Sequence, residues 1–249
     1  MKQVENLIQV IHSLDLDAPC FPPTLIYNEG WMLRILLEWL SNNRQIEYRI
    51  RFQSNAKWFS EAQLPTPFKA RYRGDKLAES RTNADGVIGQ FIIGSEGKTD
   101  INLLPTATQF IILEAKLFSK LSKGIKNAPD YDQAARNVAC MAEVLKRTGM
   151  DSITTISLGF YLLVPESRLS SNSFIEMNRD SIHNKVKIRV ESYKGEKDAW
   201  YKDWFLPLLN TIEISIITWE EVIDLIVSLD PKYGFSFKEF YEICMKVNA

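Results

Sequence analysis

The chain has 249 residues, of which 45% are hydrophobic and 24% charged, and its 30 Lys and Arg residues nearly balance its 31 Asp and Glu residues to give a net charge of -1. This composition is typical of a globular domain, and it excludes disorder, a collagen-like structure and a coiled coil for the chain as a whole. Because there is no basic excess, any contact with nucleic acid has to come from local clusters of Lys and Arg.

The few cysteines and histidines exclude further classes of site. Cys20, Cys140 and Cys244 lie far apart and no Cys-x-x-Cys occurs, so neither a disulfide framework nor a Cys-rich zinc site is expected. His12 and His183 cannot form a zinc helix, and no Gly-x-Ser-x-Gly elbow indicates a serine hydrolase. Carboxylates and lysines are left as the agents of any chemistry. No signal peptide and no apolar run of about twenty residues is present, so no membrane contact and a cytoplasmic location are expected.

In the first part of the chain, the hydrophobic pattern predicts an amphipathic helix near residues 7–14 and a second helix over about 29–42, with Asn28 as its N-cap. Alternation over 46–52 predicts a half-buried strand or an extended arm. Residues 85–93 are expected to form a strand that runs into a turn at Gly94. The polar segment 95–108 is expected to be a loop or an insertion.

Further along, residues 110–113 are apolar on both faces, which is typical of a central strand covered on both sides. A helix is expected from about 129 to 147, with Gly149 ending it. Residues 156–164 and 212–217 are expected to be strands, 186–190 an exposed strand, and 219–226 a helix capped by Thr218. This order predicts one α/β domain.

The strongest chemical signal joins Asp85, on one predicted strand, to Glu114 and Lys116, at the end of another. Side chains alternate along a strand, so Glu114 and Lys116 point to one face and Ala115 to the other. If the strands are neighbours, two carboxylates meet beside an amine. Such a pair repels unless a divalent cation lies between them, and hard oxygen ligands suit Mg²⁺ or Mn²⁺. Lys116 would then orient an attacking water or offset charge on a phosphoryl group.

A structural ion pair is the alternative interpretation. An acidic residue two positions before a lysine occurs three times in the chain, in Glu96-Gly97-Lys98, Glu114-Ala115-Lys116 and Asp230-Pro231-Lys232. The tripeptide alone therefore carries little information. Glu114 differs from the others in its position at the end of a doubly buried strand, where an unpaired charge is costly.

These residues resemble a known family. Asp85-Gly86, followed by Phe110-Ile111-Ile112-Leu113-Glu114-Ala115-Lys116 and a helix with Gln133, resembles the PD-(D/E)xK nuclease superfamily, which includes restriction endonucleases and RecB-type nucleases. The resemblance covers about 29–164 and implies a three-layer restriction-endonuclease-like core, a central mixed sheet flanked by helices, with C-terminal additions over about 165–249. It implies that Asp85 and Glu114 bind the metal, that Ala115 lends its carbonyl, and that Lys116 acts on the water.

The resemblance also suggests further site residues. A metal-linked Glu on the preceding helix would be Glu29 rather than Glu38, although Glu29 equally suits the helix dipole. Gln133 would lie near the lysine, but Asn137 stands where RecB-like members have a Tyr, which is a departure from that branch. Arg136 is a candidate phosphate ligand or else a solvated helix charge.

Two basic clusters flank the predicted site and would form a positive rim for DNA, or else an ordinary solvated surface. The first contains Lys69, Arg71, Arg73, Lys76 and Arg81, and the second contains Lys120, Lys123 and Lys126. Aromatic side chains at Trp58, Phe59 and Tyr72 are candidates for stacking on bases. The expectation is thus a Mg²⁺-dependent deoxyribonuclease, compatible with a homodimer. The alternative is a non-catalytic nucleic-acid- or protein-binding module on the same fold.

Overall fold

The computed structural model describes residues 9–11, 16–80, 82–95, 97–124, 128–149, 155–171 and 174–249. Its centre is a five-stranded mixed sheet with the order β1-β2-β5-β6-β7. Strand β2 is antiparallel to both β1 and β5, whereas β5, β6 and β7 run parallel to one another. A separate antiparallel pair, β3 with β4, lies outside this sheet. The strands are β1 (Lys57–Leu64), β2 (Thr82–Gly89), β3 (Phe91–Ile93), β4 (Ile101–Leu103), β5 (Gln109–Ala115), β6 (Ser157–Val164) and β7 (Glu213–Thr218).

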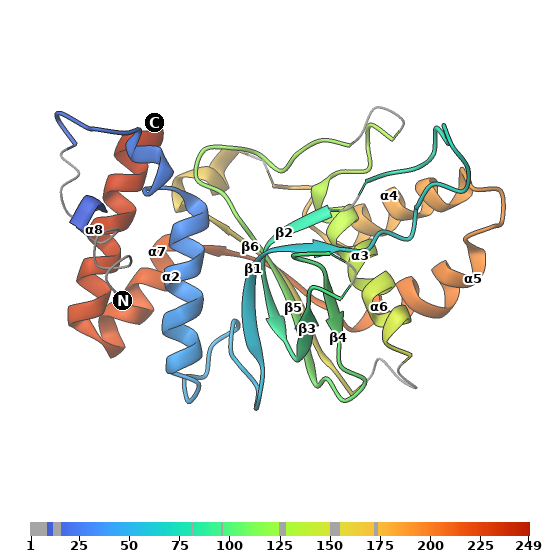
Figure 1. Ribbon diagram of the computed structural model, residues 1–249, viewed down its shortest axis with the longest axis horizontal. Coiled ribbons are helices and arrows are strands. Elements are labelled where there is room, and N and C mark those ends of the chain that lie inside the picture. The colour runs from blue at the N-terminus through green and yellow to red at the C-terminus, as the bar shows by residue number, and fades with distance from the viewer. Residues whose placement is uncertain are drawn as a thin grey trace.

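Helices cover both faces of the sheet, so the molecule has three layers (Figure 1). One face carries α2 (Glu29–Asn42), α7 (Trp219–Leu229) and α8 (Pro231–Asn248). The other carries α3 (Gln133–Thr148), α4 (Arg179–Glu191) and a continuous helical run of α5 (Asp198–Trp200), the π-helical turn η3 (Tyr201–Phe205) and α6 (Leu206–Thr211). Two 3₁₀ turns, η1 (Pro23–Leu25) and η2 (Glu166–Ser171), complete the described elements. Within the described ranges, no helix is both long and apolar enough to cross a membrane.

The central strand β5 explains why two cores exist. Every residue of β5 is buried, and successive side chains enter opposite layers. Phe110 and Ile112 pack into the core under α3, and Ile111 and Leu113 pack into the core under α2. This strand confirms the prediction of a run covered on both sides, since a strand with period two can be apolar throughout only when both faces are buried.

Local capping signals also set the helix boundaries. Asn28 accepts a hydrogen bond from the backbone N–H of Trp31 and starts α2 as predicted, and Thr218 does the same for α7. Gly149 ends α3 in the left-handed region, with φ of +68°. The start of α3 was predicted too early, because Asp132 is the residue whose side chain caps the helix.

Several predicted elements are wrong or incomplete. Residues 186–190 belong to α4, not to an exposed strand; the buried Ile182, Val186 and Val190 recur at intervals of four, and Asn178 caps the helix. Residues 46–52, predicted as a strand or an extended arm, form no strand and contain bends at 48–50. The segment 95–108 contains β4, and β1 was not predicted. Of the expected N-terminal helix, only residues 9–11 lie within the described part of the chain, and they are helical.

One irregularity in the sheet positions the site. Glu61 of β1 stands opposite Asp85 of β2, but this pair is missing from an otherwise continuous ladder. Glu61 has φ of +56°, which is uncommon for a residue with a side chain. In a regular strand, residues three positions apart point to opposite faces. Because Glu61 interrupts the alternation, Phe59 and Ala62 instead pack into the same core. Figure 1 shows β1 turning sharply part-way along its length. Because β2 pairs with β5 only from Gly86 onward, the strands separate at Asp85.

Candidate active site

The site lies where β2 leaves β5. The last ladder pair is Gly86 with Leu113, so Asp85 and Glu114 come next to each other at the point of separation. Oδ2 of Asp85 accepts a hydrogen bond of 2.9 Å from the backbone N–H of Ala115. Nζ of Lys116 lies 3.4 Å from Oδ2 of Asp85 and 3.3 Å from Oε2 of Glu114. Adjacent strands thus bring the two acids and the amine together.

Glu114 is the most enclosed member of the group. Its side chain is 0% exposed, and donors from α3 reach both of its oxygens. Nδ2 of Asn137 donates to Oε1 and Nε2 of Gln133 donates to Oε2, each at 2.6 Å. Since an isolated carboxylate in such surroundings would be costly, the donors and the Lys116 ammonium compensate its charge.

Electrostatics set the protonation of this cluster. Burial, and then the charge of Asp85, raise the pKa of Glu114 well above its ordinary value, against the opposing effects of Lys116 and Asn137. Burial alone would lower the pKa of Lys116, but the carboxylates of Asp85 and Glu114 outweigh it and raise that pKa. Lys116 is therefore an ammonium ion in this arrangement.

Gln133 is hydrogen-bonded to the loop that follows Lys116. The backbone N–H of Ser122 donates to Oε1 of Gln133 at 3.1 Å, and the N–H of Gln133 donates back to the carbonyl of Ser122 at 3.0 Å. Arg136, half-buried, donates to the Ser122 hydroxyl at 2.9 Å, while its Nε is buried and has no hydrogen-bond partner among the described residues. Gln133 thus connects the loop after Lys116 to Glu114.

The other candidate metal ligands, Ala115 and Glu29, add no carboxylate to the cluster within the described residues. Ala115 packs into the core under α2, so its methyl group points away from Glu114 as expected. Glu29 stands at the start of α2, close enough to Cys244 of α8 that, after burial, its charge raises the pKa of that thiol. Within the described residues, no hydrogen bond or ion pair joins Glu29 to the cluster. Glu38 instead accepts from the Trp58 indole at 3.2 Å.

Two residues near the cluster, Asn137 and Glu61, were given no role from the sequence. Asn137 was noted only as a departure from the RecB-like pattern, yet it is fully buried and donates to Glu114. Its spacing of four from Gln133 on a predicted helix is a signal that both share one face. Glu61 was not considered, because β1 was not predicted. Its pKa is raised by burial and then by the charge of Asp85, and its carboxylate lies 3.4 Å from Nη2 of Arg34.

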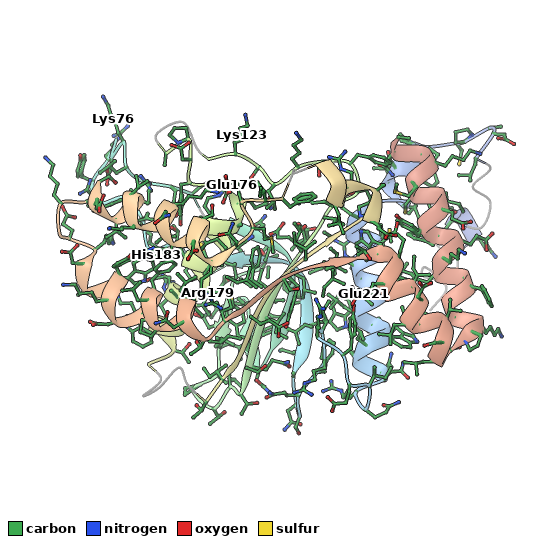
Figure 2. The ribbon with its side chains drawn as sticks, turned by 180° about the vertical axis from the view of Figure 1, so that it is seen from behind. Lys76, Lys123, Glu176, Arg179, His183 and Glu221 are labelled. Atoms are coloured by element: carbon green, nitrogen blue, oxygen red, sulfur yellow. The ribbon has the colours of Figure 1, made fainter. Side chains whose placement is uncertain are left out.

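The basic clusters divide into exposed and engaged members. Arg73, Lys76, Lys120 and Lys123 are exposed, and Figure 2 shows Lys76 and Lys123 projecting at the same edge of the molecule. Arg71 is instead engaged in an ion pair with Asp75, at 2.8 Å, and a second with Glu196. Arg81 and Lys126 lie outside the described residues.

The donor chemistry of the cluster suits a hard dication with few protein ligands. Asp85 and Glu114 offer carboxylate oxygens, and the side chain of Asp85 is 26% exposed. Within the described part of the chain, no three His, Cys, Asp or Glu side chains form a ready-made metal cage. Mg²⁺ is often held by one or two carboxylates together with waters and substrate phosphates, so two carboxylates fit this ion but not a closed structural site.

Two pockets in the surface are lined by residues outside the cluster. A pocket of about 140 Å³ lies between residues 128–131 and α4, and a groove of about 440 Å³ runs beside Phe91 and Leu104. The half-exposed Asp85 is not among the residues lining either one. Comparison with protein-family models, curated proteins and solved structures finds no match for this chain.

Proposed function

We propose that this protein is a metal-dependent nuclease of the PD-(D/E)xK type that hydrolyses phosphodiester bonds in DNA. The observation that carries the proposal is the meeting of Asp85 with the fully buried Glu114 on adjacent strands, with the Lys116 ammonium within 3.4 Å of both. Two acids held together at the separated end of a sheet are costly without a counter-charge, and such groups concentrate at functional sites.

The order of elements supports this proposal. Along the chain, α2, β1, β2 and β5 precede α3 and β6, which is the helix, three strands, helix and strand order that the resemblance implies. A second support is that the Asp85 side chain is 26% exposed, so a phosphate could reach one acid of the cluster from solvent.

In this proposal, each described side chain has a separate task. Asp85 and Glu114 hold Mg²⁺ or Mn²⁺, and the carbonyl of Ala115 is a further oxygen donor. When bound, the ion would supply a water of lowered pKa and a counter-charge for the phosphoryl oxygens. Lys116 donates hydrogen bonds to the phosphate as negative charge develops, because its raised pKa keeps it protonated.

Gln133 and Asn137 act on Glu114 rather than on the substrate. By donating to both oxygens, they fix the carboxylate in one orientation and favour its ionised form. In the same proposal, Arg136, Arg73, Lys120 and Lys123 bind and neutralise phosphates of the DNA backbone.

Plasmid cleavage with Mg²⁺ or Mn²⁺ tests the proposal. We expect Glu114→Gln, Asp85→Asn and Lys116→Met each to lower the rate by about 10²-fold or more, with the fold preserved by circular dichroism. Lys98→Met, in one of the other two acidic-x-lysine tripeptides, is the matched control and should cut normally. A well-folded wild-type protein that cuts no nucleic acid under varied metals would contradict an enzyme, and full activity in all three variants would contradict the site.

One observation favours a non-catalytic module instead. Both oxygens of Glu114 already have protein donors, so the cluster is also a self-contained ion pair. Calorimetry with Mn²⁺ separates the two functions. A catalytic site should bind the ion with an affinity that falls in Asp85→Asn, whereas a structural pair should bind none. In the latter case, the exposed lysines would still retain DNA in a gel-shift assay.

A further inference from the structure

In the first half of α2, which packs against β1 and β2, an exposed indole and a guanidinium form a pair. The Trp31 side chain belongs to a residue that is 42% exposed, although the helix around it is otherwise a core element. Cζ of Arg34, one turn later, lies 5.1 Å from the centroid of the Trp31 ring. The guanidinium therefore lies over the indole, and the residue as a whole stays partly accessible to solvent.

Contacts connect this pair to the proposed catalytic residues. Nε of Arg34 donates to the Ser60 hydroxyl at 3.0 Å, and Nη2 lies 3.4 Å from Oε1 of Glu61. Glu61 stands opposite Asp85 at the irregular point of β1, and its pKa is shifted by both Asp85 and Lys116. The chain of contacts thus runs from the indole through Arg34 to Glu61, whose position in β1 is opposite that of Asp85 in β2.

We infer that Trp31 and Arg34 form a platform for an unpaired nucleotide of the substrate strand. A nucleobase stacks on the open part of the indole, and Arg34 binds the adjoining phosphate. This inference rests on the proposed function, which it deepens by naming the substrate class: a strand that is single or frayed beside the scissile bond. Aromatic rings favour unpaired bases because a duplex hides the faces of its bases, whereas Arg contacts the phosphates of either form.

The partner chemistry follows from the two groups together. An indole alone could meet any apolar surface, but one carrying a guanidinium combines a π face with a positive charge. Nucleotides offer the matching arrangement of a flat base and a phosphate. Two of the three stacking candidates expected from the sequence fit less well, since Phe59 packs toward the core and the Trp58 indole donates to Glu38. The third, Tyr72, is exposed beside the Arg71 guanidinium, but Arg71 is held by ion pairs with Asp75 and Glu196.

Fluorescence anisotropy with labelled oligothymidylate, and with the same strand annealed to oligodeoxyadenylate, tests the platform in EDTA, so that no cleavage is needed. For Trp31→Ala, we expect a loss of affinity for the single strand of roughly 5- to 150-fold and little change for the duplex. Arg34→Met should weaken both forms and reduce the salt dependence by about one phosphate contact.

Phe235→Ala is the control for loss of an exposed aromatic residue. Phe235 is 60% exposed near the start of α8, and among the described residues no hydrogen bond, ion pair or ring contact joins it to Trp31 or Arg34. We expect no change in affinity. Unchanged single-strand affinity in Trp31→Ala, or equal losses for the single strand and the duplex, would overturn the platform alone. Absence of any nucleic-acid binding in the wild type would overturn the proposed function as well.

Discussion

Asn137 donates a 2.6 Å hydrogen bond to Glu114 from one turn after Gln133, so a single face of α3 determines how the buried acid is held. The Oδ1 atom of this Asn is itself buried without a hydrogen-bond partner among the described residues. Burying Oδ1 of Asn137 without a partner costs free energy. We therefore expect the hydrogen bond from its Nδ2 to affect the chemistry of Glu114.

We therefore predict that Asn137→Ala lowers nuclease activity by about 10- to 100-fold, as loss of a group supporting a metal ligand usually does. With one donor fewer, the pKa of Glu114 should rise further, and the pH at which activity appears should move upward. A pH–rate profile measures this shift. Asn137→Ser restores a short polar group and should recover part of the activity. A fall in rate with an unmoved profile would show that Asn137 is only a packing residue.

Two buried tryptophans allow a matched test of the support under Lys116. Nε1 of Trp219 donates to the Lys116 carbonyl at 3.1 Å, whereas Nε1 of Trp39 has no hydrogen-bond partner among the described residues. Both Trp→Phe changes remove the same atoms from a buried site, but Trp219→Phe loses a hydrogen bond and Trp39→Phe loses a buried donor that had no partner. We expect Trp219→Phe to lower the free energy of unfolding by about 0.5–1.5 kcal/mol more than Trp39→Phe. Urea denaturation measures both, and equal losses would count against the bond.

Gly86 is predicted to be intolerant of a side chain. A Cβ atom there would lie 3.0 Å from Cδ2 of Leu33 and 3.1 Å from Cδ1 of Leu37, both of them fully buried in α2. We expect Gly86→Ala to destabilise the fold by about 1–3 kcal/mol through overpacking. Chemical denaturation gives the value. Adding Leu33→Val to Gly86→Ala should restore part of the lost free energy of unfolding. If the two substitutions instead lower it additively, the contact between Gly86 and Leu33 is contradicted.

Acid sensitivity is expected from Asp75, which the Arg71 guanidinium binds through both oxygens. The hydrogen bonds from Arg71 lower the pKa of Asp75 from its ordinary value of 3.8. Because the folded-state pKa is the lower one, the stabilisation is complete above about pH 4 and is lost as the pH falls through the folded value. We expect Asp75→Asn to be less stable at pH 7 and to show a flatter decline between pH 4 and pH 2 in denaturant midpoints. Parallel declines would contradict this assignment.

The parts of the fold that were predictable are those where one physical signal acts alone. Asn28 and Thr218 mark helix starts because their short acceptors suit free backbone N–H groups. Ile111 and Ile112 mark the central strand because both faces are buried. In β1 two signals conflict, because the left-handed Glu61 reverses the alternation half-way and leaves Phe59 and Ala62 on one face.

The proposed site was predictable only in its charged members. Asp85, Glu114 and Lys116 stand out because charges at the ends of buried strands are costly. Asn137 and Glu61 are recognisable only once packing shows what they face. Over residues 186–190, alternation of Val and Ile with charges indicates a strand. The wider spacing of four between Ile182, Val186 and Val190 is helical, and these three are buried while Ile188 is exposed.

The bond from Trp219 to Lys116 also has a consequence for dissecting the protein. Trp219 follows β7, which forms an edge of the main sheet well beyond residue 164. A fragment shortened to the portion that resembles nucleases would lose that edge and uncover apolar surface on β6. The minimal working unit therefore extends past the resemblance, and attempts to graft the cluster onto a smaller scaffold would need to carry the C-terminal strand and the tryptophan with it.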